Sequence, residues 1–153
     1  MQKQNLSIIY GTTSYTGFDF EALPLAAARL VAAEQIDQIA DQCRIGVVGD
    51  SLRAVEFQMA EDDAKAFQAA GFAGQVPATV QATVDALEVT PQEAAESILQ
   101  ESAAWRTALC EIRAARPKGK QAVLKAESHA EAERLTDAAT GEIRLSVIGV
   151  SAA

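Results

Sequence analysis

The chain has 153 residues, of which 49% are hydrophobic and 5% aromatic, and much of the hydrophobic share is alanine. Because alanine buries little surface, the core should be thin for this length and should favour closely packed helices. The formal net charge of −8 disfavours binding to nucleic-acid phosphates or to an anionic membrane. Since no apolar stretch has membrane-spanning length and the polar N-terminus is no signal peptide, we expect synthesis in the cytoplasm, with no nucleic-acid or membrane partner.

The N-terminal segment predicts short β-structure. Leu6–Tyr10 is a β-type run that ends at Gly11. Residues 11–17 are rich in Thr, Ser and Gly, a composition typical of a loop or a weak hairpin. Residues 18–20, Phe-Asp-Phe, are then either a second short strand or a hydrophobic anchor.

The first helix is expected over residues 21–43, with Pro24 in its first turn, where the missing N–H costs nothing. Residues 45–49 break its apolar pattern. The sequence Gly46–Ser51 lacks the Gly-Lys-Ser/Thr ending of a phosphate loop, so we interpret it as a turn between helices. Asp50 or Ser51 is then suited to cap the next helix.

The second helix is expected over residues 52–70. Its apolar line consists of Leu52, Val55 and Met59, and the line is broadened by Phe57, Ala60, Ala64 and Phe67. Consecutive acidic residues at 61–63 point in different directions on a helix, so they indicate a solvated face and not a catalytic pair. Gly71 lies where a helix C-cap belongs, and residues 76–87 predict a short third helix.

Thr90-Pro91-Gln92-Glu93 predicts a helix start, with Thr90 as N-cap, proline at the first helical position and Glu93 at the third. This helix should continue to about Arg116, where Pro117 and Gly119 interrupt it. A weaker helical pattern over residues 120–139 then forms with it either a helical hairpin or one long kinked helix.

Ile143, Leu145 and Val147 alternate with polar residues after Gly141, which predicts a C-terminal strand that pairs with Leu6–Tyr10 or with another partner. The expected fold is therefore mainly α, with helical hairpins and short terminal β-strands. The expected segments are residues 1–45 (strand, loop and helix), 46–140 (helical hairpin domain) and 141–153 (strand).

The residues that usually carry chemistry form no recognisable site in the sequence. His129 is the single histidine and lies on a polar helix, so we expect a surface residue and no metal ligand. Cys43 and Cys110 have no CxxC spacing, which favours two buried thiols over a disulfide. We therefore predict no catalytic residue, no cofactor and no metal.

Three residues are candidate partner contacts: Trp105, Arg113 and Arg116. Trp105 lies on the apolar stripe of its helix, which suits a core position or an oligomer contact. The two arginines belong to the one basic cluster, with Lys118, Lys120 and Lys125. That cluster either stabilises a helix end and aids solubility or meets an acidic partner surface.

Several short segments resemble small Ala-rich proteins encoded among the tail genes of tailed bacteriophages and prophages, where the pattern also occurs in a tail-fibre-associated module. They lie between roughly residues 47 and 126: Val55-Glu56-Phe57, residues 66–77, residues 90–95, Ala103-Ala104-Trp105, residues 112–116 and Lys118-Gly119-Lys120. These segments are caps, turns and core positions, so they identify a fold better than an activity. The resemblance predicts an aliphatic residue where Pro117 stands, and so an earlier helix break in this chain.

The resemblance implies a non-enzymatic phage tail component: a structural or fibre-associated subunit, or a tail assembly factor. Such a protein is made in the host cytoplasm, is located in the virion tail and contacts other tail proteins. The thin core independently favours a homo-oligomer. The alternative is a cytoplasmic adaptor or regulator that binds a partner helix.

Overall fold

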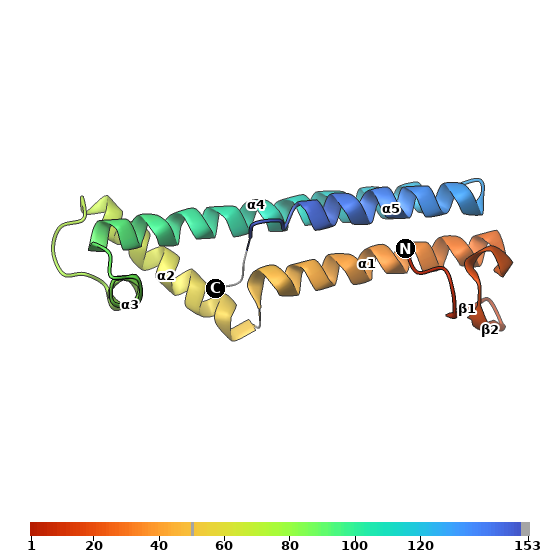
Figure 1. The fold of residues 1–153 in the computed structure, drawn as a ribbon, viewed down its shortest axis with the longest axis horizontal. Helices are drawn as coiled ribbons and strands as arrows, with labels where there is room; N and C mark the ends of the chain where they lie inside the picture. The colour runs from red at the N-terminus through yellow and green to blue at the C-terminus, as the bar shows by residue number, and fades with distance from the viewer. Residues whose placement is uncertain (50, 151–153) are drawn as a thin grey trace. The chain divides into compact units, whose positions relative to one another are not determined.

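The computed structural model describes residues 1–49 and 51–150, without the side chain of Ser51. Within these residues, five α-helices and a two-stranded antiparallel sheet confirm the expected mainly α fold (Figure 1). The elements in chain order are β1 (Leu6–Tyr10), β2 (Thr13–Phe18), the 3₁₀ turn η1 (Phe20–Ala22), α1 (Leu25–Val48), α2 (Ser51–Ala69), α3 (Ala78–Leu87), α4 (Pro91–Leu124) and α5 (His129–Leu145).

The chain divides into two compact units. Unit 1 combines Met1–Arg44 with Cys110–Gly149, and unit 2 is built on Ile45–Leu109. The long helices α1 and α4 therefore contribute to both units. This division differs from the three consecutive segments expected from the sequence, because the second half of α4 and all of α5 belong with the N-terminal residues.

The N-terminal strands form a hairpin, which was one of the two expected alternatives. Tyr10 pairs with Thr13 across the two-residue loop Gly11-Thr12, and Gly11 takes a φ of +61°. A positive φ at the first loop position suits glycine and matches the right-handed twist of the strands. The second strand is residues 13–18, whereas Phe20 lies in η1 and is buried.

Small side chains fill the core of unit 1, where α1, α4 and α5 pack together. The core combines many alanines with a few large residues, including Phe20, Leu23, Ile36, Ile112, Val123 and Ile143. At Gly119 of α4, an added Cβ would lie 2.5 Å from the Cβ of Ala139 on α5. Glycine is therefore required there by the close approach of the two helices, and it does not break α4.

The expected helix break at Pro117 is wrong, because α4 continues through this residue to Leu124. Proline removes one backbone hydrogen bond, but the helix on both sides is held by buried Ile112, Ala115 and Val123. Tertiary packing thus outweighs the local cost. Arg113, Arg116, Lys118 and Lys120 of the basic cluster consequently lie within α4, and only Lys125 follows its end.

Helix α5 begins after a short turn, and its cap explains where the chain reverses. The Ser128 hydroxyl accepts a hydrogen bond from the Glu131 N–H at 3.2 Å, and Glu131 accepts one from the Glu127 N–H at 2.7 Å. Ser-x-x-Glu at residues 128–131 is a capping pattern that the sequence already contained.

The expected C-terminal strand is also wrong, since α5 runs through Gly141 to Leu145 and turns follow to Gly149. Ile143 lies four residues after Ala139 and is fully buried in the same stripe, so helical burial outweighs a short alternation. β1 pairs with β2 instead. Residues 151–153 of the predicted strand lie outside the described residues.

Helix α1 likewise extends past its predicted end, because residues 45–48 are helical. Val47 is fully buried and lies seven residues after Ala40, so it continues the apolar stripe. The predicted cap at Asp50 or Ser51 falls on a residue and a side chain outside those described.

His129 is not the surface residue that the sequence suggested. It is half-buried at the first position of α5, and its Nε2 lies 2.9 Å from the carbonyl oxygen of Leu23. Its ring also meets Phe20 edge-on, with 5.7 Å between ring centroids. Because the two contacts connect α5 to η1 and its C-cap, the histidine has a structural role in unit 1.

The capping box at the start of α4 is confirmed. The Thr90 N–H donates to Glu93 Oε2 at 2.9 Å, and the Glu93 N–H donates to Thr90 Oγ1 at 3.3 Å. The bonds to Thr90 lower the pKa of the Glu93 carboxyl. Together they satisfy two backbone donors that the helix itself leaves unpaired.

We expect Thr90→Ala to lower the free energy of unfolding by about 1 kcal/mol, because the N-cap acceptor is lost. Chemical denaturation of both proteins measures this change. Thr107→Ala makes the same substitution in the exposed middle of α4 and should leave stability equal or slightly higher. An unchanged midpoint for Thr90→Ala would show that the cap does not stabilise the folded chain.

Candidate functional site

Trp105 lies inside unit 2, between α4 and α2. Only 8% of its surface is exposed, and its ring centroid is 3.9 Å from that of Phe57. The two rings and Leu109 line a cavity of about 150 Å³. Trp105 therefore has a core position, which was one of the two alternatives that the apolar stripe suggested.

Glu61 lies beside this cavity and is not on a solvated face. It is buried, and its carboxylate pairs with Lys65 Nζ at 2.6 Å and Arg106 Nη2 at 2.5 Å. The hydrogen bond from Lys65 and the positive charge of Arg106 lower the pKa of Glu61 although burial opposes this. Glu61 joins α2 to α4 through Arg106. The solvated position predicted for it from the three consecutive acidic residues is therefore wrong, because its ion pairs allow the carboxylate to be buried.

Arg113 and Arg116 belong to unit 1, whereas Trp105 belongs to unit 2. Arg116 is already paired, with its Nε 2.5 Å from Asp37 Oδ1, and Lys120 bonds to the other oxygen of the same carboxylate. Burial raises the pKa of Asp37, but the hydrogen bonds from Lys120 and Arg116 outweigh it and lower the pKa below its usual range.

Arg113, by contrast, is exposed on α4, and it makes no ion pair or hydrogen bond to any side chain among the described residues. Of the two candidate arginines, Arg113 is therefore the one whose guanidinium is available to an acidic partner. Arg116 holds α4 against α1 through Asp37.

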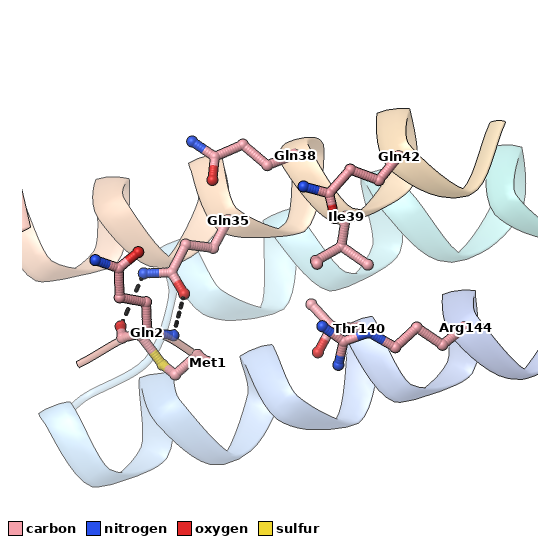
Figure 2. Close-up of a pocket in the computed structure, with 8 residues that line it drawn as sticks. All are labelled: Met1, Gln2, Gln35, Gln38, Ile39, Gln42, Thr140 and Arg144. Atoms are coloured by element: carbon pink, nitrogen blue, oxygen red, sulfur yellow. Dashed lines mark hydrogen bonds between the residues drawn. The ribbon is translucent and has the colours of Figure 1, made fainter. Parts of the chain in front are cut away.

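A polar cleft of about 370 Å³ lies in unit 1 between α1, α5 and the N-terminal residues (Figure 2). Gln35, Gln38 and Gln42 of α1 line it together with Thr140 and Arg144 of α5. Gln35 and the backbone of Gln2 exchange two hydrogen bonds, at 2.8 and 2.9 Å. The lining offers amide, hydroxyl and guanidinium groups for hydrogen bonds. In the sequence, the only sign of this cleft is three glutamines at helical spacing, a pattern that does not by itself predict a binding site.

The single apolar line expected for α2 divides into an exposed set and a buried set in the structure. Leu52, Val55 and Met59 are 74%, 57% and 57% exposed, whereas Ala64 and Phe67 are buried in unit 2. The two apolar sets lie on different faces of the helix, so only the second set builds the core. The first set forms an exposed stripe, which we call the α2 line.

Among the described residues, the cysteines and acidic side chains do not gather into a metal-binding cluster. Cys43 and Cys110 are both free, but Cys110 is exposed, because it lies between the buried positions Ala108 and Ile112 and points the other way. Across residues 1–49 and 51–150, no three His, Cys, Asp or Glu side chains come together to hold a metal ion. In the same part of the chain, no helix is long and apolar enough to cross a membrane.

Comparisons with protein-family models, with curated proteins and with solved structures find no match for this chain.

We expect Glu61→Gln to destabilise the protein by about 1–2 kcal/mol at neutral pH, between the values typical of surface and buried ion pairs. Folding lowers the pKa of Glu61. The ion pair therefore stabilises the folded state fully above the unfolded-state pKa of about 4.3, and this stabilisation is lost as pH falls through the pKa of the folded state. Thermal melts from pH 7 to pH 3 should therefore show the gap between mutant and wild type narrowing below about pH 4. Asp62→Asn, at the exposed neighbour, is the control. A gap that stays constant with pH would contradict the pairing.

Trp105→Ala should lower the free energy of unfolding by about 3–5 kcal/mol, since loss of a large buried ring leaves a cavity. Denaturation followed by circular dichroism measures this loss. Trp105→Phe retains a ring against Phe57 and should lose less. Indole emission at the wavelength of a fully exposed tryptophan in the wild type would place the side chain outside the core.

Proposed function

We propose that this protein is a non-enzymatic component of a bacteriophage tail, either a structural or fibre-associated subunit or an assembly factor, that acts through contacts with other tail proteins. The observation that carries the proposal is the α2 line. Three large apolar side chains on one face of a helix are costly in water and mark a contact surface. The resemblance of residues 47–126 to tail-encoded proteins includes this helix and supports the choice of partner.

The chemistry of the α2 line favours an amphipathic helix as partner. Its residues follow the i, i+3, i+7 spacing by which a helix lies along another helix. Exposed Glu56 and Asp62 flank the line on its two sides. A helix with Lys or Arg beside its apolar stripe complements this arrangement, and charge complementarity favours that orientation.

The same spacing supports the second candidate, a cytoplasmic adaptor that binds a partner helix. The two functions differ in where the protein resides. A tail component copurifies with phage particles or tail intermediates, whereas an adaptor copurifies with one host protein and is absent from the particles.

We expect Val55→Glu to abolish copurification with tail proteins, because it places a charge in the centre of the α2 line. The stability of the chain should change by less than about 0.5 kcal/mol, since the side chain is exposed. The measurement is mass spectrometry of particles and tail intermediates from the source strain, with tagged wild type and mutant.

Gln68→Glu is the matched control, since it adds the same charge at an exposed position on the opposite side of α2. It should copurify like the wild type. Absence of the wild-type protein from both particles and tail intermediates would reject the tail function. Normal copurification of Val55→Glu would show that the α2 line is not the contact.

A further inference from the structure

The N-terminal hairpin of unit 1 leaves one strand edge open. In β2, every residue except half-buried Tyr15 is exposed. β1 differs, because Leu6 is buried and, with Ser7, lines a cavity with Val31 and Gln38 of α1. The sheet has only these two strands within the described residues, so β2 is the edge that faces away from α1.

The register identifies the backbone groups on this edge. Tyr10 and Thr13 flank a two-residue loop, and such a pair exchanges both of its hydrogen bonds. Because hydrogen-bonded and non-hydrogen-bonded pairs alternate, Tyr15 also bonds to β1, whereas Ser14 and Thr16 point their N–H and C=O groups outward. No other described residue bonds to these outward groups.

Over residues 13–16, β2 has none of the features that normally protect an edge. Residues 6–18 contain no charged residue, no histidine and no proline, although the whole chain carries a net charge of −8. Natural edge strands are usually blocked by lysine, proline or a bulge. The single register shift here lies between Leu6 and Ser7 and leaves Gly17 of β2 without a partner, so the bulge begins one residue beyond Thr16. Two copies of this segment can therefore approach without charge repulsion.

We propose that β2 pairs antiparallel with β2 of a second copy of this chain, which extends the hairpin to a four-stranded sheet across a two-fold axis. Ser14 lies opposite Thr16 of the second copy, and each such pair exchanges both backbone hydrogen bonds. The two Tyr15 residues face each other at the axis as a non-hydrogen-bonded pair. Four strands are also more stable than an isolated two-stranded ribbon. This contact is independent of the α2 line, so either proposal can fail alone.

Sedimentation velocity of the full chain over a range of concentrations tests the contact, with a concentration-dependent dimer as the expected result. Thr16→Pro should give a monomer with unchanged circular dichroism, since its N–H points away from β1 and proline is tolerated on such an edge. Thr16→Lys should weaken dimerisation by about tenfold through charge on the edge. Ser7→Lys is the matched control, because it adds the same charge at the residue opposite Thr16 but on β1.

A cysteine cross-link tests the register. In a Cys43→Ser, Cys110→Ser background, Tyr15→Cys should form a disulfide-linked dimer on oxidation, because Cα atoms of a non-hydrogen-bonded pair are about 4.5 Å apart. Thr12→Cys, in the loop, should not. A wild-type chain that stays monomeric, a dimer that Thr16→Pro and Thr16→Lys leave intact, or equal weakening by Ser7→Lys would overturn the proposal. Cross-linking at Thr12 in preference to Tyr15 would overturn the register.

Discussion

The close approach of α4 to α5 at Gly119 is the constraint on which unit 1 depends. With no side chain at residue 119, the Cβ of Ala139 and the side chain of Ile36 reach the backbone of α4 directly. Alanines at neighbouring core positions keep the three helices near one another over their length, where many small contacts add up. A chain with few aromatic residues can build a dry core in this way. The same packing keeps α4 helical through Pro117.

Unit 2 is held by different interactions. Its helices meet through larger side chains, including Phe67, Val80 and the Phe57–Trp105 pair. Polar bonds join the same elements: Glu61 connects α2 to α4, and Thr79 Oγ1 donates to Asp63 Oδ2 at 2.6 Å. Two of the three consecutive acidic residues thus stabilise the unit, which leaves Asp62 to flank the exposed side of α2.

The two surfaces proposed for binding, the α2 line and the edge of β2, are those that the packing within each unit leaves uncovered. Ala64 and Phe67 fill the interior of unit 2, whereas Leu52, Val55 and Met59 of the same helix face water. β1 begins beside α1, and no described residue of unit 1 bonds to the outward backbone groups of β2 at Ser14 and Thr16. An apolar helix face attracts another helix, whereas an open strand edge attracts a strand, so the two surfaces select partners of different kinds.

The sequence alone determined the elements whose signal is local. The helical class, the first strand and the start of α4 at Thr90 follow from composition, β-type residues and a capping box, and each needs only a few neighbouring residues. The tertiary structure decided everything that depends on distant contacts. Pro117 and Gly141 remain helical because their neighbours are buried against other helices, and Ile143 joins that core as part of a helix. Glu61, His129 and Cys110 were misplaced for the same reason: burial of a side chain depends on which elements fold against it, and no local pattern records that.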